Sequence, residues 1–226
     1  MSTLVPIKDA ATIIVMRDRA TTPAVLMGQR GALAAFMPGK FVFPGGAVDP
    51  SDAQTPHTAL QQVCASRLQE QTTIAPGALA AAAIRELWEE TGQVLGTQQN
   101  WTEPPHGWRG FAATGHVPNL AALTFFFRAV TPVGPARRFD ARFFVADAQD
   151  LCTDPDDFSR AEDELSHLQW VPLSHTRDFD LPFITQVVLA ELNAYLPNTG
   201  PPDTVPYFKN DDEQHLVYRL KGASPL

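Results

Sequence analysis

The sequence has little cysteine and little positive charge, and each shortage excludes a class of protein. Its two cysteines, Cys64 and Cys152, provide no disulfide framework and are not spaced as zinc ligands. Lysine and arginine number 17 against 25 acidic residues, which leaves a net charge of −8. General binding to nucleic acids or anionic membranes needs a basic surface. We therefore expect neither a nucleic acid nor a membrane as a partner.

Long apolar runs, internal repeats and low-complexity segments are also lacking. No apolar run approaches the length of a membrane span. The first residues lack the basic start and apolar segment of a signal peptide, and the final Ser-Pro-Leu differs from the Ser-Lys-Leu peroxisomal address. These features predict a cytoplasmic location. Hydrophobic residues make up 44% of the chain, which is enough for a proper core.

A cluster of glutamates on a predicted helix is the main positive feature. Residues 78–84 are rich in alanine, the best helix former, and Gly92 stands where a glycine would end the helix. Glu86, Glu89 and Glu90 are spaced i, i+3 and i+4, so they project from one face. Three such charges repel one another unless a cation lies between them. Hard cations such as Mg²⁺ prefer these oxygen ligands, although a solvated charged face is the alternative.

A second stretch, residues 43–46 (Phe-Pro-Gly-Gly), follows a β-rich run and predicts a tight turn. Together the two stretches resemble the Nudix box, G-x5-E-x7-R-E-U-x-E-E-x-G-U, in which U is apolar. Gly46 takes the opening glycine, Asp52 stands where the family has glutamate, and residues 85–92 match the second half position by position. Gln93 occupies the final apolar position.

The spacing inside this motif departs from the family pattern. Residues 53–84 separate Asp52 from Arg85, which is 32 residues where the pattern has seven. Apolar residues at helical spacing predict a helix over residues 58–69 of the insertion, followed by a loop over 72–77. An interrupted box is similar to the branch of Nudix hydrolases that includes peroxisomal CoA diphosphatases. Residues 41–52 and 137–146 also resemble that branch.

The resemblance implies an α/β fold, a Nudix-type α/β/α sandwich with a mixed sheet and a helical insertion within the box. We expect a Nudix domain over residues 1–199, with the insertion at about 53–77, and a C-terminal extension over 200–226 that contains a hairpin. Strands are expected at 11–17, 24–30, 41–43, 120–130, 142–146 and 165–173, and a last helix at 182–195. The aromatic loop 101–111 could either stack on a ligand or cap the core.

The resemblance also implies a reaction. Nudix enzymes use Mg²⁺ or Mn²⁺ to hydrolyse the phosphoanhydride of a nucleoside diphosphate linked to another moiety, and this branch points to CoA or acyl-CoA. ADP-ribose or a dinucleotide is an alternative substrate. A non-catalytic Nudix-fold sensor that binds a nucleotide is an alternative of another class. We expect a small nucleotide-derived partner, and a homodimer is a possible assembly.

Specific residues follow from matching the motif. The implied metal ligands are Glu86, Glu89, Glu90 and the backbone carbonyl of Gly46. The implied catalytic residues are these three glutamates, Arg85, and Glu164 from the acidic loop before the strand at 165. Arg137, Arg138 and Lys40 are candidates for binding substrate phosphate, with ordinary surface charge as the alternative. Gly45, Gly46, Asp52 and Gly92 are expected to shape the motif, with Asp52 paired to Arg85.

Overall fold

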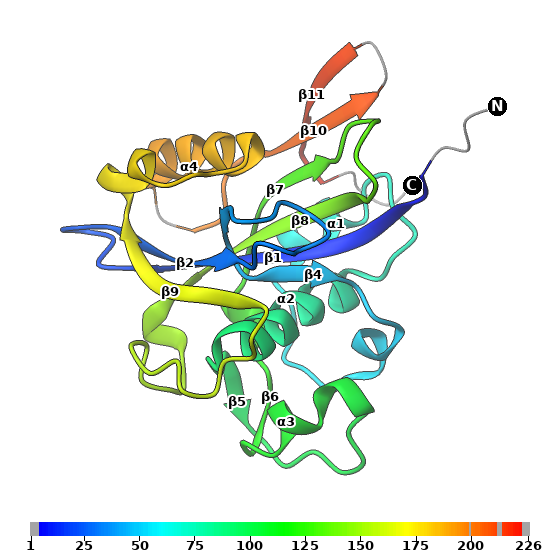
Figure 1. Ribbon diagram of the computed structural model, residues 1–226. Coiled ribbons are helices and arrows are strands. Elements are labelled where there is room, and N and C mark those ends of the chain that lie inside the picture. Colours follow the sequence, from blue (N-terminus) through cyan, green and yellow to red (C-terminus); the bar gives the residue numbers. More distant parts are fainter. Residues whose placement is uncertain (1–4, 199, 212–213, 223–226) are drawn as a thin grey trace.

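The computed structural model describes residues 5–198, 200–211 and 214–222 and contains one large mixed sheet (Figure 1). Its nine strands run in the order β11-β10-β7-β8-β1-β2-β3, with β4 paired to β1 and β9 paired to β2. The strands are β1 (Ile7–Arg17), β2 (Ala24–Arg30), β3 (Phe41–Val42), β4 (Gly45–Ala47), β7 (Thr124–Val130), β8 (Arg138–Asp147), β9 (Leu165–Pro172), β10 (Val205–Asp211) and β11 (Gln214–Leu220). A small second sheet pairs β5 (Gly96–Gln98) with β6 (His116–Pro118).

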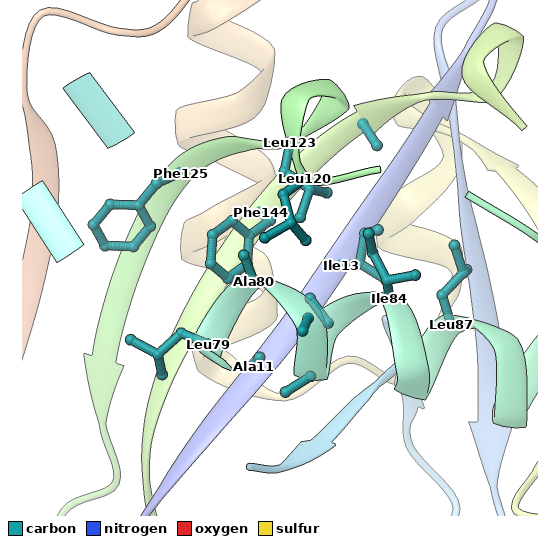
Figure 2. Close-up of a cluster of buried hydrophobic side chains, with 14 of the residues drawn as sticks. Ala11, Ile13, Leu79, Ala80, Ile84, Leu87, Leu120, Leu123, Phe125 and Phe144 are labelled. Atoms are coloured by element: carbon teal, nitrogen blue, oxygen red, sulfur yellow. The ribbon is translucent and has the colours of Figure 1, made fainter. Parts of the chain in front are cut away.

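Helices cover both faces of the large sheet. The helices are α1 (Gln62–Leu68), α2 (Pro76–Thr91), α3 (Arg109–Ala112) and α4 (Phe183–Tyr195). In Figure 1, α2 lies below the sheet and α4 above it. Alternate residues of β1 pack on opposite faces of the sheet, because successive side chains on a strand point to opposite faces. Ile13 belongs to the core on the α2 side, shown in Figure 2, whereas Ile14 packs with residues of α4. The predicted α/β/α sandwich with a mixed sheet is confirmed.

Helix α2 forms the centre of the structure. Pro76 occupies its first turn, where a missing N–H costs nothing, and Gly92 ends it in a left-handed conformation with φ 73°. Every residue from 78 to 87 is buried. The alanines let the helix approach β1 closely on one side while the chain from 93 to 123 covers the other. The helix predicted from the alanine-rich run is therefore confirmed.

Several element boundaries differ from the sequence predictions. β1 and β8 each begin four residues earlier than predicted, and two other elements begin later. The inserted helix begins at Gln62 instead of residue 58, because the Thr58 N–H donates to the carbonyl of Pro118 at 3.1 Å and its hydroxyl donates to Asn119. The strand predicted from residue 120 begins at Thr124, since Leu120–Ala122 forms a 3₁₀ turn. In both places hydrogen bonds between distant segments overrode local propensity.

The predicted C-terminal hairpin is present as β10 and β11, and it extends the sheet. β10 runs parallel to β7, and Val205, Tyr207 and Leu220 are buried in the core on the α2 side. Arg67 of the insertion donates to the carbonyls of Pro202 and Asp203 at 2.6 and 2.7 Å. The insertion and the C-terminal segment thus contact each other. The division into a domain over residues 1–199 and an extension from residue 200 stays a prediction.

The insertion is also attached directly to the sheet. Arg128 of β7 donates to the carbonyls of Glu70 and Gln71, at 2.8 and 3.0 Å, and pairs with Asp140 of β8. Because Arg128 is almost fully buried, these partners satisfy donors that would otherwise be left without water. Among the residues that the structure describes, no helix has the length and apolar character needed to cross a membrane.

Candidate active site

The site is built around the buried guanidinium of Arg85 on α2. Nε and Nη2 donate to the two carboxylate oxygens of Asp52, at 2.9 and 3.1 Å, and Nη2 also donates to the carbonyl of Ala47. Nη1 donates to Glu86 at 2.8 Å and to Glu89 at 3.1 Å. Burial alone would lower the pKa of Arg85, but the hydrogen bond with Asp52 and the nearby carboxylates raise it above its usual value. Arg85 is therefore a permanent cation beneath the glutamates.

Asp52 is fully buried and uses both carboxylate oxygens within the protein. Besides Arg85, Oδ1 accepts from the indole N–H of Trp108 at 3.1 Å, and Oδ2 accepts from the Asp49 N–H at 2.8 Å. The second of these bonds is part of a capping box on the 3₁₀ turn Pro50–Gln54. Asp52 therefore has the contacts of a brace for Arg85. The indole contact could not be found from the sequence, because it joins residues 56 positions apart.

Glu90 lies deepest among the three glutamates. Its Oε2 accepts from the Gly45 N–H at 2.7 Å, whereas its Oε1 is buried and has no hydrogen-bond partner among the described residues. Burial, with the charge of Glu86 adding to it, raises the pKa of Glu90 well above its ordinary value. A Cβ on Gly46 would fall 2.5 Å from the carboxyl of Glu86, so a larger residue here would push the Glu86 carboxylate out of its position. The glycine turn and α2 thus meet at the carboxylates.

Glu86 and Glu89 both accept hydrogen bonds from Arg85, and they differ in exposure. Burial raises the pKa of Glu86 to about 7, against the opposing effect of Arg85. Burial also raises the pKa of Glu89, whose side chain remains 29% exposed. A hollow of about 270 Å³ lies beside these groups and is lined by Asp49, Ser51, Arg85, Glu89, His106 and Gly107. Glu89 and Arg85 therefore have a space next to them that a ligand could enter.

The donor set fits a hard divalent cation in its chemistry. Among the residues that the structure describes, no three His, Cys, Asp or Glu side chains converge as a ready metal-binding group. Arg85 Nη1 binds one oxygen of Glu86 and one of Glu89. The second oxygen of each, and the unpartnered Oε1 of Glu90, remain as ligands of the type that Mg²⁺ and Mn²⁺ prefer. A cation would bind by competing with Arg85.

We expect the protein without metal to lose stability as the pH rises from about 4.5 to about 7. The pKa of Glu86 is about 7 in the folded protein, against 4.5 as its model value, so the folded state holds a proton that the unfolded state has released. The stabilisation from this group is complete below pH 4.5 and is lost as the pH passes 7, a change of about 3 kcal/mol.

The measurement is thermal unfolding in EDTA across this pH range. Glu86→Gln is the matched control and should reduce the dependence, leaving the part that comes from Glu89 and Glu90. Adding Mg²⁺ should raise Tm more at pH 8 than at pH 5, because the ligands must be deprotonated. A Tm that does not fall between pH 4.5 and 7 in EDTA would contradict the expectation. So would a fall of the same size in Glu86→Gln.

Glu164 lies directly before β9 and faces the end of β2. Its Oε1 accepts from Arg30 Nη2 at 2.8 Å, and its side chain is 55% exposed. Burial is the main cause of the raised pKa values of Glu86 and Glu90, and the charge of Glu164 raises both further, which brings Glu164 within electrostatic reach of them. Sequence reasoning did not assign Arg30. Its signal would have been an arginine ending a strand just before the loop that leads to the glycine turn.

The three residues predicted to bind substrate phosphate do not gather at the carboxylates. The Arg138 side chain is buried, and its Nε donates to the carbonyl of Thr131 at 3.1 Å. Arg138 pairs with Ile7 of β1 and Gly46 with Ala11, so their backbones are separated by four residues along that strand, or roughly 13 Å. Arg137, beside Arg138 in the chain, is exposed.

The carbonyl of Lys40 accepts from the Arg30 N–H at 2.9 Å, whereas its side chain is paired within the protein. Lys40 Nζ pairs with Asp180 at 2.5 Å, next to the start of α4. Trp108 and Phe111 are fully buried with rings 5.4 Å apart, so these two aromatics cap the core. Helix α1 lies against β7, where Cys64 contacts the backbone of Phe125.

Comparison with known proteins places this arrangement in a family. No family model matches the chain. A Caenorhabditis elegans protein of the nudix hydrolase class is 30% identical over 185 residues, which cover 73% of this chain and 51% of the relative. The chain thus spans about half the length of the curated relative that it matches. The crystal structure of a NUDIX hydrolase from Alicyclobacillus acidocaldarius matches with a TM-score of 0.62 and 27% identity, over 88% of this chain and 99% of that one.

Helices α2 and α4 flank the sheet, and the carboxylates around Arg85 lie against a glycine turn. These features define a Nudix-type α/β protein. The chain belongs to the Nudix hydrolase family.

Proposed function

We propose that the protein hydrolyses the phosphoanhydride of a nucleoside diphosphate linked to another moiety, with Mg²⁺ or Mn²⁺ as cofactor. The observation that carries the proposal is that Glu86 and Glu89 of α2 share Arg85, and that Glu90 beside them has a buried oxygen without a partner among the described residues. A helix gains nothing by desolvating like charges in this way, whereas a divalent cation would stabilise all three. A purely structural role for the three glutamates would not explain why these like charges are buried together.

The proposed roles follow from the contacts of each residue. Glu86, Glu89, Glu90 and the Gly46 carbonyl would hold the cation, which when bound neutralises the diphosphate and lowers the pKa of the attacking water. Arg85 keeps the glutamates in place, with Asp52 as its brace. Glu164 is half-exposed and within electrostatic reach of Glu86 and Glu90, so it is the proposed acceptor of the water proton.

A substrate screen tests the proposal. CoA, acyl-CoA, ADP-ribose and dinucleotides are incubated with Mg²⁺, Mn²⁺ or EDTA, and the products are identified by mass. We expect at least one substrate to be cleaved between its two phosphates, and EDTA to abolish the reaction. Binding of these compounds with no turnover in either metal would instead favour the Nudix-fold sensor.

CoA or acyl-CoA is the substrate proposed from the interrupted box, with ADP-ribose and dinucleotides as alternatives. We expect Arg138→Ala to lower stability and to leave any preference for CoA over 3′-dephospho-CoA unchanged, because Arg138 is buried on the carbonyl of Thr131. Tm and the ratio of kcat/KM for the two compounds measure these effects. The exposed neighbour Arg137, changed to alanine, is the matched control for stability. Loss of the CoA preference in Arg138→Ala at unchanged Tm would overturn this assignment.

Two further parts of the proposal concern the setting of the protein. We propose a cytoplasmic location, and we keep a homodimer as a possible assembly. Cell fractionation and light scattering measure these properties directly.

A further inference from the structure

Arg30, which pairs with Glu164, is an arginine with unused hydrogen-bonding capacity. Its Nη2 donates to Glu164 at 2.8 Å, which is the one hydrogen bond that its guanidinium makes to the described residues. Its Nε is buried and has no partner within the described part of the chain, and its side chain is 17% exposed. By contrast, Arg85 uses all three of its guanidinium nitrogens. Arg30 therefore has donors left for a ligand.

The backbone holds Arg30 and Glu164 opposite each other. β2 pairs antiparallel with β9, with Arg30 across from Leu165, the residue after Glu164. The register of this pair shifts between Met27 and Gln29, and His167 on the facing strand has a φ of 51°. A Cβ on Gly28 would lie 2.9 Å from both Leu165 and Leu168, so the two strands are pressed together here. Bulges of this kind re-aim side chains next to active sites.

The charge of Arg30 acts on the buried carboxylates as well. Burial and the charge of Glu86 raise the pKa of Glu90, while Arg30 lowers it. The segment that carries Glu164 also contacts α2, because the Glu162 N–H donates to the carbonyl of Glu89 at 2.9 Å, and Glu164 in turn binds Arg30. A diphosphate bound at the glutamates would therefore come near this pair. Glu164 is 55% exposed, so its carboxylate is hydrated on one side and a stronger anion can replace it on Arg30.

We propose that Arg30 binds a phosphate of the substrate. In the free protein the Glu164 carboxylate occupies the position on Arg30 that this phosphate would take. The inference rests on the proposed function, because it assigns a residue to the same site. When a diphosphate binds, its oxygens take the forked guanidinium donors and displace the Glu164 carboxylate. Glu164 is then free of its cation when substrate is present, so substrate binding and release of Glu164 are one event.

Binding of ADP, used as the probe, tests the exchange by calorimetry with Mg²⁺ and with EDTA. Arg30→Ala should weaken ADP binding by about tenfold or more, as for loss of a charge-assisted pair. Arg30→Lys should fall between the two, since lysine keeps the charge but lacks the fork. Glu164→Gln should tighten ADP binding severalfold by removing the competitor. In the double variant Arg30→Ala/Glu164→Gln, that tightening should disappear.

The matched control is Glu191→Gln on α4, which removes the acidic partner of Arg219 at 3.5 Å and should leave ADP binding unchanged. Equal tightening by Glu164→Gln with and without Arg30 would mean that Glu164 acts only by repelling the ligand, and would overturn the exchange. Wild-type affinity in Arg30→Ala, or no ADP binding by the wild type, would also overturn it. Failure of the proposed function appears separately, as ADP binding by the wild type without cleavage of any diphosphate substrate.

Discussion

Glu89→Gln is expected to lower turnover by roughly 10²–10³-fold, the scale of losing one electrostatic contact to the reacting groups. The substitution preserves the shape of the side chain and removes one charge from the three glutamates. Turnover is measured at saturating Mg²⁺, on whichever diphosphate the wild type cleaves. Near-normal turnover would remove Glu89 from the proposed metal site.

The same variant is expected to be as stable as the wild type or more stable when no metal is present. Burial already raises the pKa of Glu89 and so favours its uncharged form, and the glutamine oxygen can still accept from Arg85 Nη1. Glu103→Gln, on an exposed glutamate outside α2, is the control for the chemical change itself. Thermal unfolding in EDTA gives the comparison. A clear loss of stability in Glu89→Gln would mean that the charge serves the fold.

Asp52→Ala is expected to destabilise the protein by about 3–5 kcal/mol, the usual cost of leaving one partner of a buried ion pair alone. Arg85 would lose two hydrogen bonds and its buried counter-charge, and the Trp108 indole would lose its acceptor. For a chain of this length the loss corresponds to a fall in Tm of about 10 °C. Denaturant unfolding in EDTA measures it.

Asp52→Asn separates charge from hydrogen bonding, because the amide oxygen can still accept while the counter-charge is gone. We expect an intermediate loss of stability. Comparison with Glu89→Gln then distinguishes a brace from a ligand. An Asp52→Ala variant with wild-type stability in EDTA and a turnover as low as that of Glu89→Gln would make Asp52 a metal ligand instead.

Elements formed by residues close together in the chain could be predicted from the sequence, because local chemistry decides their conformation. The alanine run and Gly92 determine where α2 lies and where it ends, and the helix then brings Glu86, Glu89 and Glu90 to one face. The predicted strand over residues 24–30 coincides with β2, for the same reason of local pattern. The start of the inserted helix was missed because bonds from Thr58 to residues 118 and 119 replaced its first turn.

By itself, then, the sequence determined the central helix, most of the strands, the family resemblance and the glutamates of the motif. Only the tertiary structure decided which charges meet. It joined Asp52, Arg85 and Trp108 into one buried group, set Arg30 against Glu164, and left Arg138 buried on Thr131, away from the carboxylates. These contacts join segments up to 134 positions apart. Strand pairing and burial determine them, and neither is encoded in the local pattern of residues that forms a helix or a turn.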